Sequence, residues 1–127
     1  MSRHQTPLPH VWLVTDARND PGLERAIARL PRGSGVIFRH YHLAESARRA
    51  RFRAIAGAAR ARGHLVILAA TARTAKAWGA DGAYGTAALL ARGPALTRLV
   101  TAHSLRDLRQ VRRADQIAAG GGGRHRR

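Results

Sequence analysis

Five short apolar runs, separated by stretches with helical spacing, constrain the fold of this chain more than any other feature. The runs are residues 11–14, 36–38, 64–70, 83–85 and 99–102. Runs of this length that alternate with helices are typical of βαβ units, whose parallel strands are buried on both faces. The pattern therefore predicts an α/β protein built from parallel βα units.

The segments between the runs show helical periodicity. Leu23, Ala26, Ile27 and Leu30 share one helical face, and Pro31 ends that helix. A longer helix is predicted before Gly63, with a buried face made of Leu43, Ala47, Ala50, Ala54, Ala58 and Ala61. Shorter helical segments are predicted over residues 72–78 and 86–91, and a further helix with Ser104 as its N-cap.

Two architectures use this alternation. One is an open, doubly wound sheet of about five strands, and the other is a (β/α)8 barrel, which typically needs ~250 residues. The chain has 127 residues, so its length alone favours the open sheet.

Composition narrows the classes of function. Apolar residues make up 45% of the chain, which is enough for a core, and the absence of cysteine excludes disulfides, thiolate nucleophiles and cysteine-based zinc sites. The first ten residues lack the apolar core of a signal peptide, and no apolar run approaches the length of a membrane span, so a cytoplasmic protein without a membrane partner is expected.

The chain is strongly basic. The 23 Lys and Arg residues against 7 Asp and Glu residues give a formal charge of +16, which suggests an anionic partner. Arginines crowd the long helix, at positions 48, 49, 51, 53, 60 and 62. However, no aromatic side chains are interleaved with them for base stacking, and basic residues occur in every segment. A nucleic-acid partner is therefore disfavoured, although it remains an alternative.

Several segments together resemble a known family. The segments are VWLVTD (residues 11–16), GVIFRH (35–40), WGADGAYG (78–85), TAHSLRDL (101–108) and Ala114-Asp115. In this order and spacing they resemble thiamine phosphate synthase and its TenI-like relatives.

The resemblance implies a TIM barrel with its site at the C-terminal ends of the strands, and a role in thiamine biosynthesis. The family's transferases join a pyrimidine diphosphate to a thiazole phosphate and release pyrophosphate, with Mg²⁺ holding the diphosphate. Arg39 would contact the diphosphate, Thr101 would donate a hydrogen bond to a phosphate, and His103 and Ser104 would shape that loop. The expected partners are phosphorylated small molecules.

The sequence also departs from the family. Ile37 and Tyr41 replace a Gln and a Lys that flank the arginine in the family. Ala69-Ala70 stands where the family has Asn-Asp, and residues 86–89 contain no second acidic ligand. Magnesium requires hard oxygen ligands, so no retained metal cofactor is expected and no catalytic residue is assigned. The transferase activity is expected to be weak or absent, and a non-catalytic relative that binds phosphate ligands is the alternative.

The domain organisation follows from this comparison. Residues 1–10 form a leader, residues 11–117 a partial barrel similar to thiamine phosphate synthase, and residues 118–127 a flexible Gly/Arg tail. Such a barrel would stop after about five of its eight units, as expected of a truncated family member. Its exposed strand edges predict a homo-oligomer or aggregation.

Two further features have simpler interpretations. His40 and His42 lie on one side of an extended segment, but no additional ligand is evident nearby, so no metal site is predicted. Asp16 follows the first strand and is interpreted as a loop cap.

Overall fold

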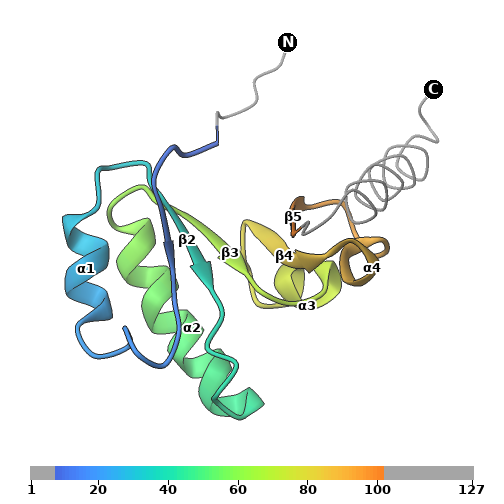
Figure 1. Ribbon diagram of the computed structural model, residues 1–127, viewed down its shortest axis with the longest axis horizontal. Helices are drawn as coiled ribbons and strands as arrows, with labels where there is room; N and C mark the ends of the chain where they lie inside the picture. Colours follow the sequence, from blue (N-terminus) through green and yellow to red (C-terminus); the bar gives the residue numbers. More distant parts are fainter. Residues whose placement is uncertain (1–7, 102–127) are drawn as a thin grey trace. The chain divides into compact units, whose positions relative to one another are not determined.

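Strands and helices alternate along residues 8–101, which are the residues that the computed structural model describes (Figure 1). Five strands form a parallel sheet, and they lie in the sheet in the order β1-β2-β3-β4-β5. The predicted α/β class with parallel βα units is confirmed. The chain divides into two compact units, with the division after Val66.

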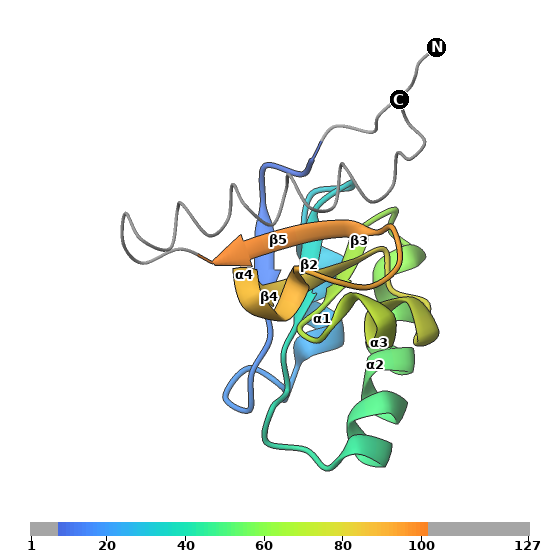
Figure 2. The same cartoon turned by 90° about the vertical axis from the view of Figure 1, so that its right-hand side faces the viewer.

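The first unit contains two complete strands and two helices. Its elements are β1 (Trp12–Val14), α1 (Leu23–Arg29), β2 (Gly35–Phe38), α2 (Glu45–Arg60) and the start of β3 (Leu65–Leu68). β1 and β2 pair in parallel, with Leu13 opposite Val36. In Figures 1 and 2, α1 and α2 lie on the same face of these two strands. When each new strand joins the same edge of the sheet, right-handed crossovers place all the connecting helices on one face.

The second unit continues the same alternation. It holds the rest of β3, α3 (Ala72–Ala77), β4 (Gly82–Thr86), α4 (Ala87–Leu90) and β5 (Thr97–Thr101). Gly79, with φ 79°, follows α3 in the left-handed conformation that glycine adopts most easily. At Gly82, a Cβ atom would lie 2.7 Å from the Ile67 side chain and 2.7 Å from the Thr97 carbonyl oxygen. Glycine is therefore required where the neighbours of β4 approach most closely.

The core of the first unit differs from the sequence prediction on one helix. The long helix is confirmed, but Ala47, Ala50 and Ala54 of its predicted buried face are exposed. The residues that it buries are Phe52, Ile55, Ala56 and Ala59. The two large side chains bury far more apolar area than alanine does, so they determine which side of the helix faces the strands.

The order of the strands bears on the two predicted architectures. A doubly wound sheet reverses its strand order at one point, whereas the order found here contains no reversal.

Within the described part of the chain, no helix is both long enough and apolar enough to cross a membrane.

Candidate functional site at the C-terminal ends of β1 and β2

A buried contact between a hydroxyl and an imidazole joins the ends of β1 and β2. Thr15 follows β1, His40 lies two residues beyond β2, and both are fully buried. The Thr15 Oγ1 atom lies 2.7 Å from Nδ1 of His40 and accepts a hydrogen bond of 3.0 Å from the backbone N–H of Arg39. In parallel α/β proteins, ligands bind at this edge of the sheet, beyond the C-terminal ends of the strands.

His40 has an unusual backbone conformation. Its φ angle of 43° lies in the left-handed region, which costs about 1–3 kcal/mol for a residue with a side chain. The imidazole ring stacks on Phe38, with the ring centroids 4.5 Å apart and the planes 7° from parallel. Such a conformation persists only where the surrounding contacts hold it, and it is typical of residues in functional sites.

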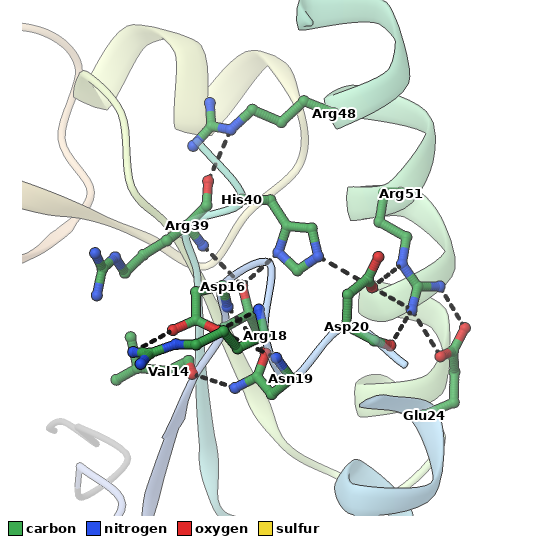
Figure 3. A network of polar contacts seen from close by, with 11 residues as sticks. Val14, Asp16, Arg18, Asn19, Asp20, Glu24, Arg39, His40, Arg48 and Arg51 are labelled. Atoms are coloured by element: carbon green, nitrogen blue, oxygen red, sulfur yellow. Dashed lines mark hydrogen bonds and ion pairs between the residues drawn. The ribbon is translucent and has the colours of Figure 1, made fainter. Parts of the chain in front are cut away.

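The loop after β1 is held in shape by its own side chains. Oδ1 of Asp16 accepts hydrogen bonds from the backbone N–H groups of Arg18 (2.9 Å) and Asn19 (3.1 Å). Asn19 in turn donates from its side chain to the carbonyl of Val14 and accepts from the N–H of Asp16. The hydrogen bond from Asn19 is the main reason why the pKa of Asp16 is lowered. The interpretation of Asp16 as a loop cap is confirmed, and this loop brings Asp20 to His40 (Figure 3).

Asp20 and Glu24 share the guanidinium of Arg51. Arg51 donates from Nε to Oδ1 of Asp20 (2.8 Å) and from its terminal nitrogens to both carboxylate oxygens of Glu24. Figure 3 shows the chain of contacts that runs from His40 through Asp20 and Arg51 to Glu24. Arg51, a side chain of α2, thereby holds both the loop before α1 and the first turn of α1 in place.

These contacts shift the pKa values of both acids. For Asp20, desolvation raises the pKa, but the contacts with His40 and Arg51 outweigh it and the net shift is downward. For Glu24, the hydrogen bonds from Arg51 are the largest effect and lower the pKa below its usual 4.5. Both side chains are therefore carboxylates at neutral pH.

We expect acid to weaken this part of the fold through Glu24. Because its pKa is lower in the folded state, its contribution to stability is present above about pH 4.5 and is lost as the pH falls through the folded value. Glu24 is half exposed, so the loss should stay below about 1 kcal/mol. The measurement is the free energy of unfolding from urea denaturation at pH 7 and at pH 3.5. Between these two pH values, Glu24→Gln should lose less stability than the unmodified protein. Glu45→Gln, also in the first turn of a helix, is the control, and equal losses in all three proteins would contradict the expectation.

Arg39 extends from the same edge, and no acidic residue in the described part of the chain pairs with it. Its guanidinium carbon lies 5.4 Å from the centroid of the Tyr41 ring, and within residues 8–101 no carboxylate is within ion-pair distance of it. Arg48 approaches the same ring at 5.5 Å and donates from Nε to the carbonyl of Arg39 at 2.9 Å. Burial lowers the pKa of Arg48, but a guanidinium remains a cation at neutral pH. Two positive charges therefore flank one aromatic ring just beyond β2.

The remaining predicted site residues lie elsewhere in the chain. Thr101 ends β5, in the second unit, and His103 and Ser104 lie outside the described residues. Buried Ala69 and its neighbour Ala70 follow β3, and residues 86–89, at the end of β4 and in α4, contain no carboxylate. The second unit thus offers no acidic Mg²⁺ ligand at either position where the family resemblance would place one.

The structure also brings together residues that the sequence analysis left apart. Ligand atoms of Asp20, His40 and His42 lie within 4.8 Å of one another. The sequence spacing pairs the two histidines but does not include Asp20, which lies twenty residues upstream of His40 in a loop whose path the sequence pattern does not define.

Comparisons with protein-family models, with curated proteins and with solved structures found no match for this chain. The resemblance to thiamine phosphate synthase therefore depends on the five short segments alone.

Proposed function

We propose that the protein binds a phosphorylated small molecule at the C-terminal ends of β1 and β2, as members of the thiamine phosphate synthase family do. The observation that carries the proposal is the guanidinium of Arg39, which extends from this edge without a carboxylate partner among the described residues. A planar guanidinium can donate two parallel hydrogen bonds to a phosphate, and for that reason arginine is common in phosphate sites.

The surroundings of Arg39 support an anionic ligand. Arg48 brings a second cation to the Tyr41 ring, and its hydrogen bond to the carbonyl of Arg39 fixes the strand end from which Arg39 extends. The ring holds both side chains near one place by cation–π contact, which limits the conformational entropy that a bound anion would have to remove.

The arrangement of the βα units supports a barrel-like fold as the finer architecture. In a (β/α)8 barrel, the strands follow one another in sequence order and the helices cover one face of the sheet. The strand order here contains no reversal, and α1 and α2 lie on the same face of β1 and β2. We therefore favour a partial barrel over the doubly wound sheet.

The proposal concerns binding more than turnover. The family's reaction separates a diphosphate from a carbon centre, and Mg²⁺ neutralises the charge that develops on the leaving group. Alanines occupy the position of one acidic metal ligand, and residues 86–89, where the resemblance would place the other, contain no carboxylate. We expect ligand binding with little or no release of pyrophosphate.

The arginines of α2 give little support to the nucleic-acid alternative. Arg51 is bonded to Asp20 and Glu24, and Arg48 is bonded to the carbonyl of Arg39. Two of the five arginines of α2 therefore have roles within the fold, and fewer are left to form a surface for phosphates along a nucleic-acid strand.

Calorimetry with thiamine phosphate and with pyrophosphate tests the proposal on the full chain. We expect the unmodified protein to bind at least one of them and Arg39→Ala to bind at least tenfold more weakly, since a charge-assisted hydrogen bond contributes roughly 1.5–3 kcal/mol. The backbone N–H that Arg39 donates to Thr15 is retained in this variant.

Arg53→Ala is the matched control, because Arg53 is exposed on α2 and its removal makes the same change in net charge. It should bind like the unmodified protein. The proposal would be contradicted by an absence of binding heat for both ligands, or by equal losses in the two variants, which would indicate attraction by the overall positive charge.

A further inference from the structure

We propose that Asp20, His40 and His42 form a binding site for a first-row divalent transition-metal cation such as Zn²⁺ or Co²⁺. One ligand atom from each side chain lies within 4.8 Å of the others, and the three come from the loop after β1 and the segment after β2. The inference is independent of the proposed phosphate binding and assigns a second ligand class to the same edge of the sheet.

The key group is the buried ring of His40. Its Nε2 atom lies 3.1 Å from Oδ1 of Asp20, yet the two atoms are not aligned as a hydrogen-bond donor and acceptor. Within residues 8–101, Nε2 has no hydrogen-bond partner, although the side chain is fully buried. A buried polar atom that is close to a charged group but makes no aligned hydrogen bond needs an explanation.

The distance between the two atoms is one that a shared cation would produce. Ligand bonds of about 2.1 Å at tetrahedral or octahedral angles place two ligand atoms about 3.0–3.4 Å apart, with their lone pairs aimed at the cation instead of at each other. The separation of 3.1 Å between His40 and Asp20 lies within that range.

The other ring nitrogen of His40 has the kind of partner that metal-ligating histidines have. Oγ1 of Thr15, 2.7 Å from Nδ1, has two acceptor lone pairs, of which the N–H of Arg39 uses one. The second lone pair can accept the Nδ1 proton, and that tautomer leaves Nε2 with a free lone pair. A hydrogen bond from the distal ring nitrogen fixes ring orientation in this way at many metal sites.

Asp20 is likewise held by a neighbour. Arg51 donates to its Oδ1 from Nε at 2.8 Å, which orients the carboxylate and keeps it ionised. The guanidinium also places a positive charge beside the site, which reduces the affinity for a cation. Ligating carboxylates are commonly hydrogen-bonded by a second group, and this pairing gives Asp20 the same arrangement.

His42 completes the set with little rearrangement. Its ring centroid lies 5.0 Å from that of His40, and the side chain is exposed, so the ring can rotate toward the other two ligands. Two imidazoles and one carboxylate suit zinc, cobalt and iron better than Mg²⁺ or Ca²⁺, which prefer oxygen ligands alone. Three protein ligands also leave coordination positions for water or another small ligand.

His64 provides an internal comparison. It is also buried, but its Nδ1 accepts from the N–H of Ser34 (3.1 Å) and its Nε2 donates to the carbonyl of Ile27 (3.0 Å). Both of its ring nitrogens are used by the backbone, as expected of a histidine with a purely structural role. His40 differs from it in Nε2, the nitrogen that lies beside Asp20.

Titration of the full, untagged chain with Co²⁺ tests the site, with the visible d–d absorption as the readout and Zn²⁺ as the competitor. We expect one cobalt ion per chain in a site of four or five ligands, and displacement of it by Zn²⁺. His42→Ala should weaken binding at least tenfold and, since His42 is exposed, should leave the circular dichroism spectrum unchanged. Asp20→Asn should also weaken binding at least tenfold.

His10→Ala is the matched control, because His10 is an exposed histidine before the N-terminal end of β1 and should not affect cobalt binding. The proposal would be overturned if the unmodified protein bound no cobalt up to millimolar concentration. It would also be overturned if folded His42→Ala bound cobalt as tightly as the unmodified protein, since the ion would then be held by other histidines.

Discussion

Phe52→Ala should destabilise the protein by about 3–5 kcal/mol, the usual cost of removing a buried phenylalanine. Phe52 is 1% exposed, lies on the buried side of α2 and meets the ring of Phe38 edge to face, with the centroids 5.4 Å apart. The substitution removes this contact and leaves a cavity between the helix and β2. Urea denaturation at neutral pH measures the loss, and a small domain with 5–15 kcal/mol of total stability would lose a large part of it.

Ala50→Gln is the control that tests which face of α2 is buried, the face found in the structure or the alanine face that the sequence predicts. Ala50 belongs to the helix face that the sequence predicts to be buried, but the structure exposes it. Glutamine is a good helix former, so this variant should change stability by no more than a few tenths of a kcal/mol. A severe effect of Ala50→Gln together with a mild effect of Phe52→Ala would mean that α2 packs on the other face.

The local structure of this chain could largely be predicted from its sequence. Each predicted strand among the described residues is present, because buried parallel strands produce short apolar runs that glycine and polar residues interrupt. The face of α2 could not be predicted from spacing alone, since alanines occur on every side of this helix. Giving more weight to the large side chains Phe52 and Ile55 would have identified the correct face.

The candidate site was predictable only in part. Arg39 and His40 were recognisable as residues that follow a buried strand, and Thr15 and Asp16 as the end of another. The role of Asp20 depends on the loop that Asp16 and Asn19 cap, which turns back beside His40. Such a tertiary contact has no periodic signal, and neither has the pairing of Asp20 with Arg51, 31 residues further along the chain.

Thr15→Val should be the most damaging substitution within the candidate site, with a cost of about 2–4 kcal/mol. Valine has nearly the same shape as threonine, so packing is preserved while the hydroxyl is lost. That hydroxyl contacts Nδ1 of His40 and accepts from the N–H of Arg39. Each polar group left without a partner in a buried environment costs roughly 1–3 kcal/mol. The measurement is the free energy of unfolding from urea denaturation.

Thr15→Ser distinguishes the hydroxyl from the methyl group. Serine keeps the oxygen that joins the ends of β1 and β2 and loses only one methyl group, which should cost about 1 kcal/mol. If the hydroxyl also orients His40 for a cation, Thr15→Ser should retain cobalt binding. Thr15→Val, where it folds, should bind cobalt more weakly. Equal stability of the valine and serine variants would show that the hydroxyl contributes little, and that the left-handed conformation of His40 is held instead by its stacking on Phe38.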